Sequence, residues 1–158
     1  MRLADNTVLV TGGGSGIGLA FAEKFLELGN RVIICGRNSK KLEVTARQHP
    51  GLVTRCCDLA DAGQMAALVQ TIEDEFPDLN ILVNNAGIQF NYRFDDGGDH
   101  LTRIDEEVNA NFTSHLRLTD ALLPLLLAKP QAAIINVSSA LSRVPKESAP
   151  VYCATKAG

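Results

Sequence analysis

The chain is 158 residues long, 46% hydrophobic and 21% charged, a composition typical of a globular protein with a single domain. Its formal net charge of −3 provides no basic surface for nucleic acid or anionic lipid, so we exclude both as partners. The sequence opens without a signal-peptide pattern, and its longest apolar run, Ala121–Ala128, is too short to span a bilayer. We therefore expect a cytoplasmic protein with no membrane span.

The cysteines and histidines show no metal-binding pattern. The four cysteines are Cys35, Cys56, Cys57 and Cys153. None of them forms a CxxC pair, so we expect free, mostly buried thiols and neither a metal site nor a disulfide framework. The three histidines are His49, His100 and His115. They lack ligand spacing, and we expect all three at the surface.

Short apolar runs alternate with amphipathic stretches along the chain. In chain order this pattern predicts a strand at Thr7–Thr11, a helix at Gly18–Leu28, a strand at Arg31–Cys35, a helix at Lys40–Gln48, a strand at Leu52–Cys57, a helix over Met65–Phe76, a strand at Ile81–Val83, a helix at Leu101–Ala128, a strand at Ala132–Val137 and a helix from Val151 onward. The alternation predicts an α/β fold in which helices cover both faces of a parallel sheet. The polar loop Asn91–His100 is a candidate mobile loop at the mouth of a site.

A glycine-rich loop, TGGGSGIG, separates the first strand from the first helix. Gly12, Gly16 and Gly18 would permit a tight turn and let a pyrophosphate approach the backbone and the helix N-terminus. The spacing is GxxxGxG, because Ile17 stands where the more common GxGxxG would need a glycine. A flexible turn is the alternative, but the position between a strand and a helix favours phosphate binding. We expect Ser15 and Ile17 to belong to the same binding loop.

Three further motifs follow in order. Asn84–Gly87 (NNAG) ends the fourth strand, Ser139 follows the fifth, and Tyr152 and Lys156 form a YxxxK pair thirteen residues after the serine. Together with the glycine loop, these motifs resemble the short-chain dehydrogenase/reductase family from end to end. The stretches AIINVSS and APVYCATKA also resemble the subgroup of oxidoreductases named after D-alanine transfer operons.

The resemblance implies a Rossmann-type doubly wound sheet and an oxidoreductase that moves hydride between a nicotinamide cofactor and a carbonyl or alcohol. Tyr152 would exchange a proton with the substrate oxygen, and Ser139 would polarise that oxygen. Lys156 would hold the nicotinamide ribose, and it lies on the same helix face as Tyr152, where an ammonium stabilises a phenolate. Asn111 would position a water beside the lysine, with Asn109 a less favoured register. Taken alone, Tyr152 and Lys156 would indicate an exposed helix face and Ser139 a turn at the end of a strand. Asn111 could be an exposed or locally bonded side chain within a helix.

The end of the second strand bears on the choice of cofactor. An acidic residue there would bond the ribose hydroxyl of NAD(H), but the stretch Ile34–Asn38 has none and contains Arg37. A guanidinium suits a phosphate, which favours NADP(H); NAD(H) remains the alternative if Arg37 only stacks on adenine or faces solvent. By resemblance, Asp58 and Leu59 line the adenine pocket. The residues that flank the adenosine ribose would be Asn85, Ala86 and Gly87.

The chain stops two residues after Lys156, whereas members of the resembled family continue with further strands. We therefore expect residues 1–158 to form one dinucleotide-binding domain that lacks the C-terminal strands of the usual fold. A full-length form would be a homo-oligomeric enzyme acting on a small molecule. A catalytically inactive dinucleotide-binding module or interaction protein is the alternative. Ser139 and the YxxxK pair argue against a methyltransferase-like domain.

Overall fold

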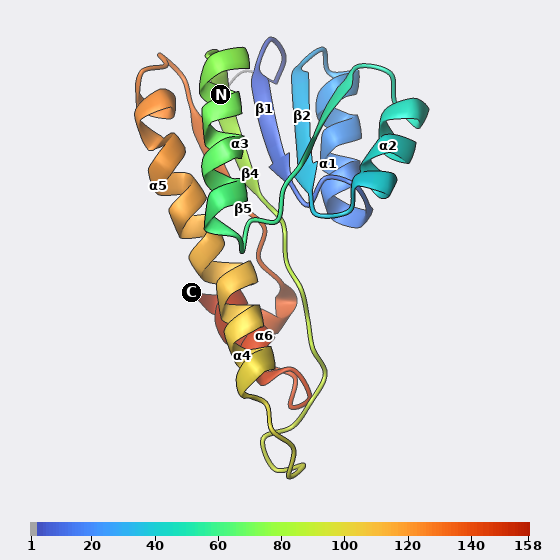
Figure 1. The fold of residues 1–158 in the computed structure, drawn as a ribbon, viewed down its shortest axis with the longest axis vertical. Helices are drawn as coiled ribbons and strands as arrows, with labels where there is room; N and C mark the ends of the chain where they lie inside the picture. The colour runs from blue at the N-terminus through green and yellow to red at the C-terminus, as the bar shows by residue number, and fades with distance from the viewer. Residues whose placement is uncertain (1–2) are drawn as a thin grey trace.

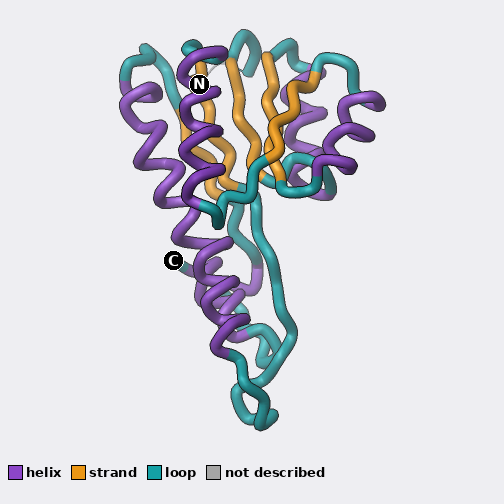
Figure 2. Tube along the Cα trace, viewed as in Figure 1, coloured by secondary structure: helices purple, strands orange, loops and turns teal. Residues whose placement is uncertain are grey.

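A computed structural model describes residues 3–158, and it places a parallel sheet between two layers of helices (Figures 1 and 2). The strands are β1 (Thr7–Thr11), β2 (Arg31–Gly36), β3 (Leu52–Cys56), β4 (Leu79–Asn84) and β5 (Ala133–Asn136). The helices are α1 (Gly16–Glu27), α2 (Ser39–Gln48), α3 (Ala62–Glu75), α4 (Leu101–Val108), α5 (Ser114–Leu127) and α6 (Pro150–Ala157). Each lies close to its predicted position.

The order of the strands is β3-β2-β1-β4-β5, and every neighbouring pair is parallel. The chain therefore builds one half of the sheet outward from β1 and then crosses over to build the other half from β4. This is the doubly wound Rossmann-type arrangement expected from the sequence. It leaves a crevice at the carboxyl ends of β1 and β4, which is where such sheets bind ligands.

Two apolar layers hold the sheet. Val8 and Val10 of β1 face the layer that includes α1 and α2, whereas Leu9 faces the layer that includes α3 and α5. All three side chains are fully buried. Burial on both faces explains why the strands are continuously apolar instead of alternating.

The predicted helix Leu101–Ala128 is not one regular α-helix. Helices α4 and α5 are joined by a π-helical turn at Asn109–Thr113, and Asn111 lies in this turn. A π-helical turn contains an additional residue and is often found at functional sites. A short 3-10 helix at Ala140–Ser142 is a further element that the apolar pattern does not predict.

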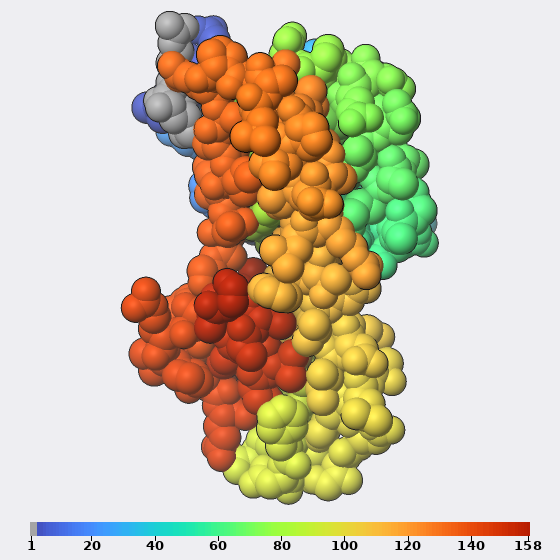
Figure 3. All heavy atoms as spheres, turned by 90° about the vertical axis from the view of Figure 1, so that its left-hand side faces the viewer, coloured from blue at the N-terminus to red at the C-terminus, as the bar shows by residue number. Residues whose placement is uncertain are grey.

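The chain extends beyond the carboxyl ends of the strands as a second group of segments (Figure 1). Residues 88–100, helix α4 and residues 140–157 lie together there, and α6 packs against α4 and the π-helical turn (Figure 3). The loop Asn91–His100 is held at one end, because the Tyr92 N–H donates to the Ser148 carbonyl oxygen at 2.9 Å and Arg93 forms a salt bridge with Glu147. Its mobility remains a prediction.

The histidine prediction is wrong for two of the three residues. His100 is buried and stacks on the Tyr92 ring, with 4.4 Å between centroids. His115 is half-buried on α5, and its Nε2 atom is inaccessible to solvent. His100 is buried against its own loop, and His115 lies near Lys156, which is distant in sequence. Of the cysteines, only Cys56 is exposed, and all four are free thiols.

Among residues 3–158, no helix has both the length and the apolar character needed to cross a bilayer. The same residues contain no group of three or more histidine, cysteine, aspartate or glutamate side chains arranged to hold a metal ion.

Candidate active site

The glycine loop and the NNAG motif lie side by side because β1 pairs with β4. Thr11, at the end of β1, joins them. Its buried hydroxyl accepts hydrogen bonds from the N–H groups of Asn85 and Ala86, at 2.9 and 3.0 Å. The Asn85 side chain in turn donates to the Thr11 carbonyl oxygen at 2.9 Å. The two motifs therefore form one rigid edge of the crevice.

Close backbone packing explains the glycines in this loop. A Cβ atom at Gly12 would lie 2.9 Å from the Ala86 Cα, and one at Gly18 would lie 2.4 Å from the Gly12 carbonyl oxygen. At Gly13 a Cβ would lie 2.6 Å from the Ile34 Cβ, so this glycine also has a packing role. Side chains at these positions would collide with neighbouring protein atoms and displace the loop. Gly16 instead adopts a φ of +55°, with nothing within 4 Å of its Cβ position.

The N-terminus of α1 is open to an anion. Ser15 is the N-cap residue, but its side chain makes no capping hydrogen bond, and the first turn holds no acidic residue. Ile17 is 64% exposed beside it. The free N–H groups of this turn and the helix dipole therefore favour a negative group here. The glycine cradle and this helix end together fit the phosphates of a dinucleotide.

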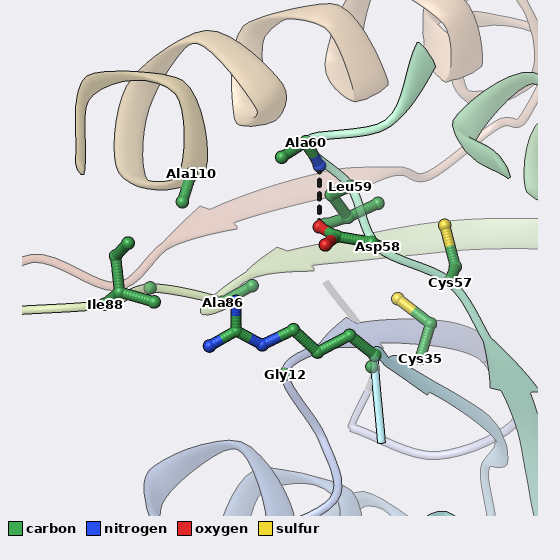
Figure 4. Close-up of a pocket in the computed structure, with 12 residues that line it drawn as sticks. Gly12, Cys35, Cys57, Asp58, Leu59, Ala60, Ala86, Ile88 and Ala110 are labelled. Atoms are coloured by element: carbon green, nitrogen blue, oxygen red, sulfur yellow. Dashed lines mark hydrogen bonds between the residues drawn. The ribbon is translucent and has the colours of Figure 1, made fainter. Parts of the chain in front are cut away.

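A pocket continues from the glycine loop along the carboxyl ends of the strands (Figure 4). Its lining residues are Gly12, Cys35, Gly36, Arg37, Cys57, Asp58, Leu59, Ala60, Ala86, Gly87, Ile88 and Ala110. Asp58 is oriented by the Ala60 N–H, which donates to its Oδ1 atom at 3.0 Å. Burial raises the pKa of the Cys35 thiol to about 12 and that of the Cys57 thiol to about 11, so both stay neutral. These two thiols make one wall apolar.

Arg37 is exposed directly after β2, at the rim of this pocket. In the described range 3–158, no carboxylate forms a salt bridge with its guanidinium. The group is therefore available to a ligand in the pocket.

The YxxxK pair lies on α6. The Lys156 Nζ atom is 5.9 Å from the centre of the Tyr152 ring and donates to the Val137 carbonyl oxygen at 3.0 Å. Burial lowers the pKa of Lys156, because desolvation disfavours the ammonium. Ser139 follows β5 and caps the 3-10 helix, where its Oγ atom accepts from the Leu141 N–H at 3.2 Å.

Asn111 joins this group to the NNAG motif. It is 3% exposed, its Oδ1 atom accepts from the Ile88 N–H at 2.7 Å, and its amide donates to the Ile88 carbonyl oxygen at 2.8 Å. The amide also donates to the Thr155 hydroxyl at 3.2 Å. A Cβ atom at Gly87 would lie 3.2 Å from Asn111 Oδ1 and 3.5 Å from Lys156 Nζ, so the three residues meet. Asn109 points elsewhere and donates to the Ala60 carbonyl oxygen at 3.3 Å.

Comparison with known proteins agrees with this geometry. The family model described as short chain dehydrogenase matches residues 6–158.

The chain belongs to the short-chain dehydrogenase family.

The oxidoreductase DltE of Bacillus subtilis (strain 168) is 46% identical over 157 residues, which cover 99% of this chain and 62% of DltE. A solved structure of a short chain dehydrogenase/reductase family protein is 32% identical with a TM-score of 0.89, and the match covers 99% of this chain and 65% of that one. The aldohexose dehydrogenase of Thermoplasma acidophilum, at 24% identity and a TM-score of 0.86, supports the fold. The match covers 98% of this chain and 57% of that structure. The chain thus spans less than two thirds of the length of these relatives.

The sequence motifs did not indicate three residues that lie at or beside this candidate site of the short-chain dehydrogenase. Thr11 and Gly13 belong to the glycine-rich stretch, but their importance lies in contacts with β2 and β4 that become apparent only in the fold. His115 lies one helical turn after Asn111, and this spacing is the single signal that could have drawn attention to it.

Proposed function

We propose that the protein is an NADP(H)-dependent oxidoreductase that transfers hydride between the nicotinamide and a carbonyl or alcohol substrate. The observation that carries this proposal is the meeting of Gly87, Asn111 and Lys156 beside the glycine cradle. This arrangement puts an ammonium next to the crevice in which family members bind a dinucleotide. If Lys156 belonged only to an exposed helix face, or the glycine loop were only a flexible turn, the lysine would not need to be half-buried beside the crevice.

The cofactor would be held by backbone and side-chain groups along the crevice. The pyrophosphate would take the cradle of Gly12 and Gly16–Gly18, with Ser15 beside it, and the adenine would take the pocket of Asp58 and Leu59. The adenosine ribose would lie against Asn85–Gly87. When bound, the nicotinamide supplies or accepts the hydride. Arg37 supports the preference for NADP(H), because its guanidinium lies at the rim without a salt bridge and can pair with a phosphate.

The chemistry of the chain itself would be proton transfer. Tyr152 would exchange its phenolic proton with the substrate oxygen, and Ser139 would donate a hydrogen bond to that oxygen and stabilise the charge on it. Lys156 would stabilise the phenolate electrostatically and hold the nicotinamide ribose. Asn111 would fix the backbone next to the lysine through its two hydrogen bonds to Ile88.

We further propose that the protein works as a homo-oligomer in the cytoplasm. The support for self-association is apolar surface on α5, where Leu116 is 55% exposed and Leu127 is 75% exposed. Large exposed apolar side chains that gather on one helix are typical of interfaces.

The replacement of Tyr152 by Phe tests the proposed role of this residue. Tyr152→Phe keeps the ring and removes the proton donor, so turnover of carbonyl substrates should fall by about 10²-fold or more while NADPH binding stays nearly unchanged. The assay is NADPH oxidation in the intact protein with a panel of carbonyl compounds. A Tyr152→Phe protein that works at the parent rate contradicts the proposal. A parent protein that binds NADPH and reduces nothing favours the inactive dinucleotide-binding module.

A further inference from the structure

The segment that follows the NNAG motif is held along one side by α4 and the π-helical turn. Asn111 accepts from the Ile88 N–H at 2.7 Å and donates to the Ile88 carbonyl oxygen at 2.8 Å. Two residues further on, Glu107 Oε1 accepts from the Phe90 N–H at 2.8 Å, and Glu107 Oε2 accepts from the Tyr92 hydroxyl at 3.4 Å. Glu107 lies four residues before Asn111, so the two side chains hold successive parts of one segment.

This segment reaches both parts of the proposed site. Ile88, at its beginning, lines the pocket at the carboxyl ends of the strands. Tyr92, at its end, donates through its backbone N–H to the Ser148 carbonyl oxygen at 2.9 Å. Ser148 lies two residues before α6, the helix that carries Tyr152 and Lys156. The position of Tyr92 therefore bears on where α6 begins relative to the pocket.

Glu107 is an unexpected residue for this place on α4. Its side chain is fully buried, and a buried carboxylate is costly unless its charge is compensated. Within the described range 3–158 none of the salt bridges includes Glu107, and its partners are one backbone N–H and one hydroxyl. An apolar side chain would fill the same space without this cost. The packing of α4 therefore does not account for the carboxylate, whereas its hold on Phe90 and Tyr92 does.

Tyr92 links Glu107 to the start of α6. Its side chain is buried, its ring stacks on His100 with 4.4 Å between centroids, and it meets the Phe94 ring edge-on at 6.0 Å. Burial and then the Glu107 carboxylate raise the pKa of Tyr92, and the positive charge of Arg103 only partly opposes them. The hydroxyl therefore keeps its proton at neutral pH and remains a donor to Glu107.

We propose that Glu107 is a positioning residue for α6, acting through Phe90 and Tyr92. The carboxylate holds Tyr92 where its N–H meets Ser148, and this contact sets how α6 presents Tyr152 to the pocket. The contacts themselves are independent of any reaction, whereas their effect on turnover rests on the proposed function. Glu107 lies outside the glycine, NNAG, serine and YxxxK motifs, so the proposal adds a residue that none of them indicates.

The first measurement is carbon-13 NMR of the intact protein labelled at tyrosine Cζ. The sequence has two tyrosines, so these residues give one signal from Tyr92 and one from Tyr152, and Tyr92→Phe assigns them. Glu107→Gln keeps the shape of the side chain but removes its charge, so the Tyr92 pKa should fall below that of the parent. An unchanged Tyr92 pKa overturns the contact on which the proposal depends.

The Tyr152 signal reports whether this contact reaches α6. Glu107→Leu fills the space but cannot accept from Phe90 or Tyr92, so the Tyr152 signal should move away from its parent position. Glu107→Gln retains an acceptor for the Phe90 N–H and should bring the signal back. Should Glu107→Leu fail to fold, Tyr92→Phe removes only the hydroxyl and should move the Tyr152 signal instead. A Tyr152 signal at its parent position in the folded variant, or one that Glu107→Gln fails to restore, overturns the positioning role.

Kinetics test the consequence for turnover. Glu107→Leu should lower kcat about ten- to a hundredfold, as expected for a misplaced reacting group, and should change NADPH affinity much less. Glu107→Gln should recover most of the lost kcat. Glu106→Leu, the same change at the exposed neighbouring position of α4, is the matched control and should keep the parent kcat.

Two results would count against the account in different ways. Equal kcat in the parent and in Glu107→Leu overturns the role of Glu107 in turnover. A parent protein that does not bind NADPH contradicts the proposed function instead, and the two tyrosine signals then still decide whether Glu107 positions α6.

Discussion

Gly12 lies in the loop before α1 and Gly18 in the first turn of α1, and the two positions require glycine for different reasons. Gly12 adopts a φ of +64°, in the left-handed region where a side chain is strained. Gly18 is in α1, and its constraint is the Gly12 carbonyl oxygen, 2.4 Å from where a Cβ would lie. A backbone atom cannot move aside as the end of a flexible side chain can. A substitution at Gly18 must therefore displace α1 or the glycine-rich loop before it.

Gly18→Ala should reduce both stability and cofactor binding. Overpacking of this kind costs about 1–3 kcal/mol of the free energy of unfolding, and the displaced loop should bind NADPH more weakly. Gly29→Ala is the control, because Gly29 has a φ of +81° but no atom within 4 Å of its Cβ position. It should cost about 1 kcal/mol through backbone strain and leave NADPH binding unchanged. Urea unfolding and NADPH fluorescence titration measure the two effects, and equal loss of binding in both variants would refute this account.

His115 should make stability depend on pH. Its pKa is lowered from 6.5 to about 4, chiefly because burial disfavours the imidazolium. The unfolded chain therefore takes up a proton at a pH where the folded protein does not, and stability falls as the pH drops from about 6.5 to about 4. Urea unfolding at pH 7 and at pH 4.5 should show a loss that is roughly 1–3 kcal/mol larger in the parent than in His115→Gln. The same loss in both proteins would contradict the buried neutral ring.

The π-helical turn Asn109–Thr113 lies between α4 and α5 and contacts the segment that follows the NNAG motif. Asn111, within this turn, satisfies both the N–H and the carbonyl oxygen of Ile88. The segment after Gly87 has left the sheet and has no strand partner there. The side chain of Asn111 thus makes the two hydrogen bonds with Ile88 that a neighbouring strand would otherwise make. The π-helical turn positions Asn111 for these bonds.

Asn111→Ala should therefore cost more than Asn109→Ala. The first change leaves both backbone groups of Ile88 without their partner, which should lower the free energy of unfolding by about 1–3 kcal/mol. The second removes one 3.3 Å hydrogen bond to Ala60 and should cost about 1 kcal/mol or less. Chemical unfolding of both variants distinguishes them, and a larger loss of stability in Asn109→Ala would contradict this account of the Ile88 contacts.

Helices and strands differ in how well the sequence predicts them. The strands are found because Val8–Val10 and Val32–Cys35 are buried on both faces, and such burial requires continuous apolar runs. The π-helical turn is not found, because the amphipathic pattern continues across it while the backbone hydrogen bonds change. The burial of His100 depends on a stacking contact with Tyr92 that residue spacing does not encode. The motifs locate the crevice, but the contacts that make it rigid come from the packing of distant segments.

In the whole molecule, the pocket lies at the carboxyl ends of the strands, whereas α6 carries the YxxxK pair beyond those ends (Figure 1). The segment that follows Gly87 connects these regions. Glu107 of α4 holds this segment, since its fully buried carboxylate accepts from the Phe90 N–H at 2.8 Å and contacts the Tyr92 hydroxyl at 3.4 Å. Arg93 holds the same segment from outside through its salt bridge to Glu147.

The Glu107 carboxylate is buried, whereas the salt bridge between Arg93 and Glu147 is exposed. We therefore expect Glu107 to contribute more to the free energy of unfolding than Arg93. Glu107→Ala leaves a buried N–H without a partner and should cost about 1–3 kcal/mol. Arg93→Ala removes exposed salt bridges to Asp95 and Glu147 and should lower the stability less than Glu107→Ala does. Thermal unfolding of the two variants provides the comparison. If Arg93→Ala proved the more damaging change, the segment would be held from its surface and not by α4.

The central claim is that this crevice binds a nicotinamide dinucleotide and prefers the one with the additional phosphate. Titration of the protein with NADPH and with NADH, followed by nicotinamide fluorescence, tests it most directly. We predict tighter binding of NADPH and a reversed order in Arg37→Asp, because one charge-assisted contact is worth about 1.5–3 kcal/mol, or roughly ten- to a hundredfold in affinity. Arg47→Asp, the same charge change at an exposed position of α2, should keep the parent order. Equal affinity of the parent for both cofactors would contradict the preference, and binding of neither would contradict the assignment of the crevice.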